Sequence, residues 1–390
     1  KRRCLCPFRK SGTGFRINAQ EITDSAAPWF RNAVPSLACY TDSTRKIVSM
    51  TGNSVFRHQH AGVLSVASVD APNVITSEWI DEQLAEVYQR NGLRAGLLAG
   101  LAGVEERRWW DEDVSFSDAA AMAGKLAIEK AGIDPSQIGV LISTSVCKEH
   151  LEPSVACLVH DRLKLSSSCL NFDIGNACLG FINAMHLGAT MIDSGSVEYV
   201  LIVDGEGSRA TQQATLERLR KPDSTALDVF AEFASLTLGS GAAAMVMAST
   251  TRHPEAHRLI GGMARAATEH NSLCVGDLDR MTTDTHGLLV AGLDLAAEAW
   301  AEALIDFTWG SGIDWYILHQ VSKVHTTMLC DRLAIDSSKA PITFPHFGNI
   351  GPAAIPITLA SVQDQIKPGQ RVLCLGIGSG LNTSALEILW

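Results

Sequence analysis

An internal repeat constrains the fold of this chain more than any other feature of its sequence. Residues 236–248 read LTLGSGAAAMVMA and residues 375–388 read LGIGSGLNTSALEI. We interpret both as an apolar strand, a Gly-Ser-Gly turn and a second apolar strand. A second pair of segments matches in the same way, because FDIGNAC (172–178) and WYILHQ (315–320) each bring an apolar strand to a reactive residue that precedes a helix. Repeated units of this kind indicate two similar halves.

The two halves alternate apolar strands with helical patterns, which predicts an α/β fold. We place an N-terminal half at 50–257 and a C-terminal half at 258–390. In such folds ligands bind where the carboxyl ends of strands converge, so we expect a site at the junction of the halves. The predicted strands are 61–69, 138–145, 169–173, 199–204 and 315–318, and the predicted helices are 76–91, 117–131 (capped by Ser117), 153–163, 178–194 and 321–333.

Residues 1–49 differ in composition from the rest of the chain. They hold nine Lys and Arg against three Asp and Glu, and they show no steady apolar period. We expect this basic N-terminal extension to be disordered or not native, upstream of a true start at Met50. The alternative is an Arg-rich targeting peptide. Cys4 and Cys6 form a C-x-C with no partner pair nearby, so we expect incidental cysteines there and not a zinc site.

Charge and hydropathy exclude several classes of function. The net charge of −10 argues against a nucleic-acid partner. No apolar run reaches the roughly 18 residues of a membrane span. The ten cysteines have no regular spacing and several lie in apolar runs, which is typical of a reducing, cytoplasmic compartment. No metal site and no cofactor are expected.

Cys178 is the candidate nucleophile. It follows the strand 169–173 and a small-residue turn, and it opens the predicted helix 178–194. A helix N-terminus carries partial positive charge and free N–H groups, which favours the thiolate and predicts a lowered thiol pKa. The Cys178 backbone N–H is also a candidate oxyanion donor. The alternative is a small buried cysteine at a tight strand–helix junction, but the neighbouring Gly175 and Gly180 favour close approach of a ligand.

Two polar residues downstream complete a set for acyl transfer through a thioester. His319 ends the buried strand 315–318, where an imidazole can act as a base or a hydrogen-bond donor. The amide of Asn349, in a glycine-rich loop, can donate to a developing enolate or oxyanion. Each also has a structural alternative, a hydrogen-bonded histidine or an Asn that turns the chain. His325 faces elsewhere on the following helix, and His346 is a weaker candidate.

Two further motifs carry less information by themselves. Glu152 precedes Pro153 at a predicted helix start, where an acid is ordinarily a cap or helix-dipole residue. The run GIGSGL at 376–381 resembles a dinucleotide-binding fingerprint, but only nine residues follow it and they read as a strand. A βαβ unit does not fit there, so we expect no nucleotide cofactor of that type.

With Cys178, His319 and Asn349 in this order, the chain resembles the thiolase superfamily over residues 61–390, and within it the ketosynthase III branch of FabH-type β-ketoacyl synthases. It is most similar to the OleA-type enzymes, which join two fatty acyl-CoAs head to head. FabH enzymes carry an apolar residue before the matching Pro-Ser, where this chain has Glu152. The motifs that carry the two resemblances are GVEERR (103–108), NACLGF (176–181), VDGEGS (203–208), LHQVS (318–322), GNIGPAAIP (348–356) and GIGSGLNTS (376–384), together with WWDEDV (109–114), HLEPS (150–154), TLERL (215–219) and GDLDRM (276–281).

The resemblance implies a thiolase fold, a five-layer αβαβα core of two βαβαβαββ halves, and a cytoplasmic homodimer. It implies an acyltransferase that performs a non-decarboxylative Claisen condensation of two fatty acyl-CoAs and releases a β-keto acid to downstream enzymes of an olefin or β-lactone pathway. Cys178 would hold the first acyl group, and Glu152 of the partner subunit would remove a proton from the second. His319 and Asn349 would steady the enolate, while backbone N–H groups of Cys178 and Gly380 would hold the thioester oxyanion.

Two alternatives remain open at this point. A FabH-type synthase III would condense acyl-CoA with malonyl-carrier protein and would not need Glu152. A catalytically silent subunit that only binds a partner is disfavoured by the intact Cys-His-Asn set. FabH enzymes hold the CoA adenine with a Trp and an Arg upstream of the motif at 103–108, and both are missing here. Arg107 and Arg108 are therefore only candidates for CoA binding, and the acyl chain lengths stay undetermined.

Overall fold

The computed structural model describes residues 52–277 and 279–390. The predicted extension at 1–49, with Cys4 and Cys6, lies outside these residues. Within the described ranges, no helix combines the length and the apolar character needed to cross a lipid bilayer.

The first half of the described chain follows the order βαβαβαββ. Its strands and helices match the predicted ones to within a few residues at each end. They are β2 (Ala61–Asp70), α3 (Phe116–Ala131), β5 (Ile138–Ser143), α4 (Val155–Arg162), β6 (Leu170–Asp173), α5 (Gly180–Asp193), β7 (Tyr199–Glu206) and β8 (Gly241–Ser249).

The second half repeats this order with one difference. Its elements are β9 (His257–Ala266), α9 (Thr285–Asp306), β12 (Trp315–Leu318), α10 (Lys323–Leu333), α12 (Ala354–Val362), β13 (Arg371–Gly378) and β14 (Asn382–Leu389). Among the described residues, the third strand is replaced by the short helices η5 (Ser337–Lys339), α11 (Phe344–Phe347) and η6 (Gly351–Ala353). This irregular stretch carries Asn349. The exact division between the halves at 257 and 258 stays a prediction.

Ten of the described strands form one mixed sheet. Its order is β12-β13-β14-β9-β2-β8-β7-β5-β6, and β1 (Ser54–Arg57) pairs with β9 at one side. The halves meet where β2 pairs antiparallel with β9, through Gly62–Arg258 and Val63–His257. The strand orders on the two sides of this junction mirror each other, with β6 and β12 at the outer edges.

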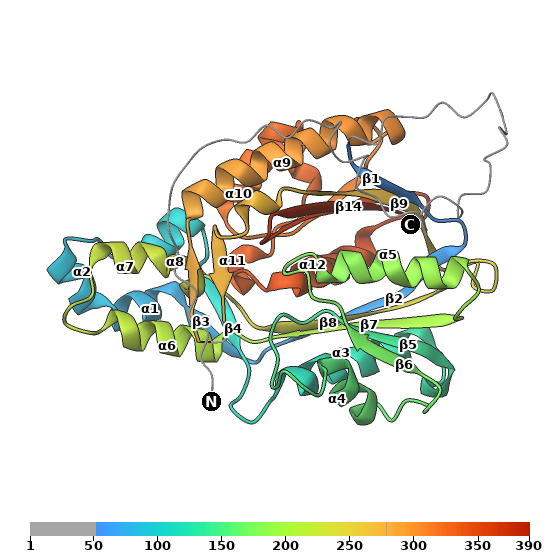
Figure 1. Cartoon of the computed structure of the whole chain (residues 1–390), viewed down its shortest axis with the longest axis horizontal. Coiled ribbons are helices and arrows are strands. Elements are labelled where there is room, and N and C mark those ends of the chain that lie inside the picture. Colours follow the sequence, from blue (N-terminus) through green and yellow to red (C-terminus); the bar gives the residue numbers. More distant parts are fainter. Residues whose placement is uncertain (1–51, 278) are drawn as a thin grey trace, which may run out of the picture. The chain divides into compact units, whose positions relative to one another are not determined.

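Five layers result from the way in which helices cover the sheet, and the thiolase fold is confirmed. Figure 1 shows α5 and α12 between the two halves of the sheet, with α3 and α4 outside one half and α9 and α10 outside the other. The central helices are apolar on nearly every side because both faces are covered; Met185 of α5 and Ile355 of α12 share one buried cluster with Val200 and Cys374. The outer helices bury small residues against the strands, as Ala120 of α3 does.

Smaller elements are inserted between these layers. A group of short helices gathers at one end of the molecule, at the left in Figure 1, around a two-stranded ribbon. The group comprises β3 (Asn73–Thr76), α1 (Ser77–Gln83), α2 (Ala85–Asn91), β4 (Glu106–Trp109), α6 (Arg209–Leu219), α7 (Ala226–Ala231) and α8 (Phe233–Leu236). The other inserted elements are η2 (Leu98–Ala102), η3 (Pro135–Gln137), η4 (Thr268–His270), β10 (Cys274–Gly276), β11 (Met281–Thr283) and η7 (Gln363–Gln365).

Local boundaries correct several predictions. The cap of α3 is Ser115, not Ser117, because Ser115 and Asp118 form a reciprocal capping box. The single helix predicted at 76–91 is broken at Leu84, whose backbone (φ −108°, ψ 9°) leaves helical geometry. The apolar run before the first Gly-Ser-Gly is also not a strand, since α8 ends at Leu236 and β8 begins only at Gly241.

Candidate functional site

The nucleophile candidate lies on a strained turn between β6 and α5. Cys178 precedes α5 by two residues and does not open it, since Leu179 is the N-cap. Ala177 has a left-handed backbone (φ 44°), a conformation that costs free energy for any residue with a Cβ. A side chain cannot replace the hydrogen at Gly180, because a Cβ there would lie 2.9 Å from the Thr144 carbonyl oxygen. The turn therefore seats the cysteine close against the end of β5.

The second Gly-Ser-Gly turn lies against the same cysteine. A Cβ on Gly378 would lie 3.4 Å from the Cys178 nitrogen and 3.3 Å from the Asn176 carbonyl oxygen. The Asn382 side-chain amide donates to Asn176 Oδ1 at 3.1 Å, and Asn176 Nδ2 donates to Asn183 Oδ1 at 2.6 Å. This chain of amides joins the first strand residue after the turn to the loop that carries the thiol.

The surroundings of Cys178 raise its thiol pKa. Burial raises the pKa of Cys178 to about 12, and Cys274 and Glu206 act in the same direction. The prediction that the helix N-terminus lowers the pKa of Cys178 is therefore wrong. The thiol is desolvated near the acidic Glu206, and it lies before the first residue of α5. A thiol with this pKa is neutral at neutral pH and must lose its proton as it reacts.

His319 lies at the end of β12, where its backbone N–H donates to the Leu375 carbonyl at 2.8 Å. Its side chain is 2% exposed, and its Nδ1 has no hydrogen-bond partner within the described structure. Burial, reinforced by His325, lowers the pKa of His319 to about 3, although a hydrogen bond to the Gly351 backbone opposes both. The expectation that His325 faces elsewhere is wrong, because its ring is close enough to affect His319 and burial lowers its own pKa to about 4.

Asn349 is held by the segment that contains the first Gly-Ser-Gly. Its N–H donates to the Thr237 carbonyl at 2.8 Å, and its carbonyl accepts from Gly239 N–H at 2.9 Å. The approach is so close that a Cβ on Gly239 would lie 1.7 Å from the Phe347 carbonyl oxygen. The two Gly-Ser-Gly turns thus have different tasks, since one supports Asn349 and the other lies beside the thiol.

Gly351 connects the histidine and the asparagine. Its N–H donates to Asn349 Oδ1 at 3.0 Å, and its backbone is hydrogen bonded to the His319 ring. The carboxylate of Glu206 lies beside it, 3.7 Å from the place of a Gly351 Cβ. Burial raises the pKa of Glu206 to about 7 and that of the neighbouring Asp204 well above its usual range. Neither acid is among the residues predicted from the sequence, although two acids inside the buried strand VDGEGS are a visible signal.

Glu152 does not join this group within the single chain. It is exposed, on the loop between β5 and α4, and makes no hydrogen bond within the described residues. The adjacent Leu151 is fully exposed, and Val146 on the same loop is 53% exposed. An apolar residue without any cover, beside a free carboxylate, is typical of a surface that another molecule covers.

The two arginine candidates for CoA binding have structural contacts. Arg107 is fully buried, and its guanidinium donates to the Ile75 carbonyl and to Ser77 Oγ, at 3.2 Å and 3.1 Å. Arg107 cannot reach a ligand in this conformation, so the prediction that it binds CoA is wrong for this structure. Arg108 lies over the ring of Phe347, 5.6 Å from its centroid. This contact places Arg108 beside the Asn349 loop, and its role toward CoA stays a prediction.

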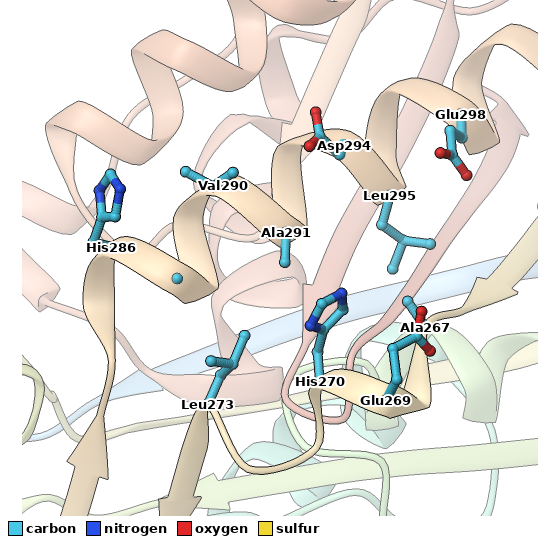
Figure 2. Close-up of a pocket in the computed structure, with 11 residues that line it drawn as sticks. Ala267, Glu269, His270, Leu273, His286, Val290, Ala291, Asp294, Leu295 and Glu298 are labelled. Atoms are coloured by element: carbon cyan, nitrogen blue, oxygen red, sulfur yellow. The ribbon is translucent and has the colours of Figure 1, made fainter.

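The described residues of the C-terminal half line a larger and a smaller cavity. The larger one, of about 510 Å³, separates the segment after β9 from α9, and Figure 2 shows His270 and Leu273 directed toward that helix. None of the candidate residues lines it. A cavity of only about 20 Å³ includes His319 among apolar neighbours such as Trp300 and Leu329. The described residues contain no cluster of His, Cys, Asp or Glu arranged to hold a metal ion.

Comparisons with known proteins agree with this architecture. The family model of 3-oxoacyl-[acyl-carrier-protein] synthase III matches residues 172–215. The model of the C-terminal domain of the same family matches residues 310–390. The chain is 44% identical over 335 residues to an acyl-CoA:acyl-CoA alkyltransferase of Xanthomonas campestris, covering 85% of this chain and 99% of that one. A Shewanella oneidensis protein of the same name is 32% identical over 349 residues, covering 86% and 100%.

Solved structures extend the similarity to three dimensions. The structure of Xanthomonas campestris OleA with bound lauric acid and lauroyl-CoA superposes with a TM-score of 0.84 at 43% identity, covering 85% of this chain and 100% of that one. The cerulenin-bound form of the same protein gives a TM-score of 0.85, covering 86% and 98%. The protein therefore belongs to the OleA-type acyl-CoA:acyl-CoA alkyltransferases, thiolase-fold condensing enzymes of the ketosynthase III branch.

Proposed function

We propose that this protein joins two fatty acyl-CoAs by a non-decarboxylative Claisen condensation through a thioester on Cys178 and releases a β-keto acid. One observation carries the proposal. The loop of Cys178 is bonded to the Gly-Ser-Gly turn through Asn176 and Asn382, while Gly351 joins His319 to Asn349. Strand ends from both halves of the sheet thus supply a nucleophile, a base and amide donors, as acyl transfer requires.

In the first step the Cys178 sulfur attacks the thioester carbonyl of one acyl-CoA. The new C–S bond forms as the bond to CoA sulfur breaks, and the thiol proton passes to the departing CoA thiolate. The ring of His319, which burial keeps neutral, would relay this proton. The backbone N–H groups of Cys178 and Gly380 would hold the oxygen that becomes negative.

In the second step an enolate forms from the other acyl-CoA. Glu152 of the partner subunit would take the α-proton, and His319 and Asn349 would donate hydrogen bonds to the enolate oxygen. The α-carbon then attacks the Cys178 thioester, which gives a β-ketoacyl-CoA and returns the thiolate. Water hydrolyses this thioester to the β-keto acid and CoA, which downstream enzymes of an olefin or β-lactone pathway would take up.

This mechanism requires a homodimer, because Glu152 lies outside its own site. The exposed Leu151 beside it and the outer edge of β6, where Leu170 is 54% exposed, support a covered surface there. An edge strand with free backbone groups pairs readily with a second chain. The free cysteines of the described chain, among them the buried Cys374, support a reducing cytoplasmic location.

Intact mass spectrometry after mixing the protein with myristoyl-CoA tests the proposal, with products extracted in parallel. The expected result is a single acyl adduct, absent in Cys178→Ala, and a β-keto acid or its decarboxylated ketone without any malonyl donor. An adduct that turns over only with malonyl-carrier protein would replace the proposal with a FabH-type synthase. No adduct at all would contradict acyl transfer from this substrate class.

A further inference from the structure

The loop that carries Glu152 is held at its base by a carboxylate of the adjacent strand. Asp173, the last residue of β6, accepts a hydrogen bond from Val155 N–H at 3.2 Å and from Ala156 N–H at 2.8 Å, at the start of α4. The same carboxylate accepts from Lys148 Nζ at 3.0 Å. One side chain therefore closes the loop from both of its ends.

This carboxylate is well placed to restrict the loop. The Asp173 side chain is 13% exposed and that of Lys148 is 37% exposed. Water therefore has little access to the Asp173 carboxylate and competes weakly with its hydrogen-bond donors. Two further carboxylates hold the loop, since Glu206 accepts from Val146 N–H at 2.6 Å and Glu149 from Ser117 N–H at 2.7 Å. Between these attachments the tip of the loop, with Glu152, is exposed. The orientation of the Glu152 side chain therefore depends on the contacts at the two ends of the loop.

We propose that Asp173 is a positioning residue that presents Glu152 to the active site of the partner subunit. The inference rests on the proposed role of Glu152 in the partner. A general base must stand within hydrogen-bond distance of the carbon it deprotonates, and a displacement of about 1 Å can cost about a hundredfold in rate. Asp173 acts on this distance through the loop and need not touch either substrate.

Asp173 also lies five residues before Cys178 in the same chain. Substituting it in both subunits would therefore not distinguish an effect on the Glu152 loop from an effect on Cys178. Mixed dimers separate them. A Cys178→Ala subunit co-expressed with a Glu152→Ala subunit, each with its own affinity tag, should keep one complete site. That site takes Cys178 from one chain and Glu152 from the other, and its condensation rate is the reference.

Asp173→Asn is then placed in one chain at a time. In the chain that supplies Glu152, it should lower the condensation rate by about tenfold to a hundredfold. In the chain that supplies Cys178, the rate should change by less than about threefold, and acylation of Cys178 should proceed as before. Asp118→Asn is the matched control, because Asp118 also forms an ion pair with α4, through Arg162, but not with the loop.

Lys148→Met is the second variant in case Asp173→Asn folds poorly. It removes one of the three bonds without changing β6, and it should show the same dependence on position with a smaller loss. Equal losses in both positions, or a loss only in the chain that supplies Cys178, would overturn the inference. No loss in either position would overturn it too. If the reference dimer itself has no activity, the partner role of Glu152 fails, and the inference fails with it.

Discussion

The Asn382 amide donates a hydrogen bond of 3.1 Å to the Asn176 side chain across 206 residues of sequence. Asn382 is the first residue of β14, and Asn176 lies two residues before Cys178. The bond ties the turn that contains Gly380 to the turn that contains the thiol. The two candidate oxyanion donors thus belong to segments that this amide pair joins.

Asn382→Ala should slow acylation of Cys178 by about tenfold, because a loosened donor pair stabilises the oxyanion less well. The rate is measured by mass spectrometry of samples quenched at successive times after mixing with myristoyl-CoA. Asn271→Ala is the control, since its amide makes only a local bond to the Thr268 carbonyl. Acylation at the rate of the unchanged protein would show that the spacing does not depend on this amide pair.

Gly239→Ala should destabilise the protein by about 1–3 kcal/mol and also reduce condensation, because the new methyl group has no space. A Cβ there would lie 1.7 Å from the Phe347 carbonyl oxygen, so the Asn349 loop must move away. Denaturant unfolding and the condensation assay measure the two effects. Gly100→Ala, where a Cβ meets nothing within 4 Å, should change neither. A Gly239 variant with unchanged activity would contradict the supporting role of this glycine.

His325→Asn should shift the acid limb of the pH–activity profile to higher pH. Burial and, after it, His325 lower the pKa of His319 to about 3. Removing that influence raises the pKa of His319, so the ring gains its proton at a higher pH and the neutral form needed for catalysis is lost earlier. Profiles of kcat/KM for both proteins test this, and an acid limb that moves to lower pH would oppose the interpretation.

The protein should lose stability as the pH falls from about 6.5 toward 4, in part through His186. Burial, together with His58, whose Nε2 lies 3.1 Å from His186 Nδ1, lowers the pKa of His186 to about 4. The unfolded chain therefore binds the proton first, and folding is disfavoured within this window. Urea unfolding at several pH values should show a smaller loss for His186→Asn. An identical pH dependence would exclude His186 as a contributor.

Local sequence patterns predicted the order of elements well. The apolar run at 138–145 is typical of a strand covered on both faces, and β5 lies there between two helical layers. The run of small and apolar residues after Cys178 predicted a helix buried on most sides, as α5 is. Such predictions succeed because the period of a helix or strand is set by residues only a few positions apart. The order of Cys178, His319 and Asn349 was equally readable, through the motifs that surround them.

Tertiary contacts decided what the sequence could not. The two Gly-Ser-Gly segments are similar in sequence, yet Gly239 packs against the Phe347 carbonyl and Gly378 packs against the Cys178 backbone. Arg107 looked available for a ligand and is fully buried. His325, in the first turn of α10, affects the pKa of His319, which lies at the end of β12.

The sequence by itself therefore determined the order of most elements and the residue types for acyl transfer, and its resemblance to a known family implied the layering. Only the tertiary structure decided which groups meet, how far burial moves the pKa of Cys178 and His319, and that Glu152 faces outward. The physical reason is that desolvation and close approach depend on segments far apart in the sequence, such as Asn176 and Asn382, which are 206 residues apart and whose contact leaves no local period in the chain.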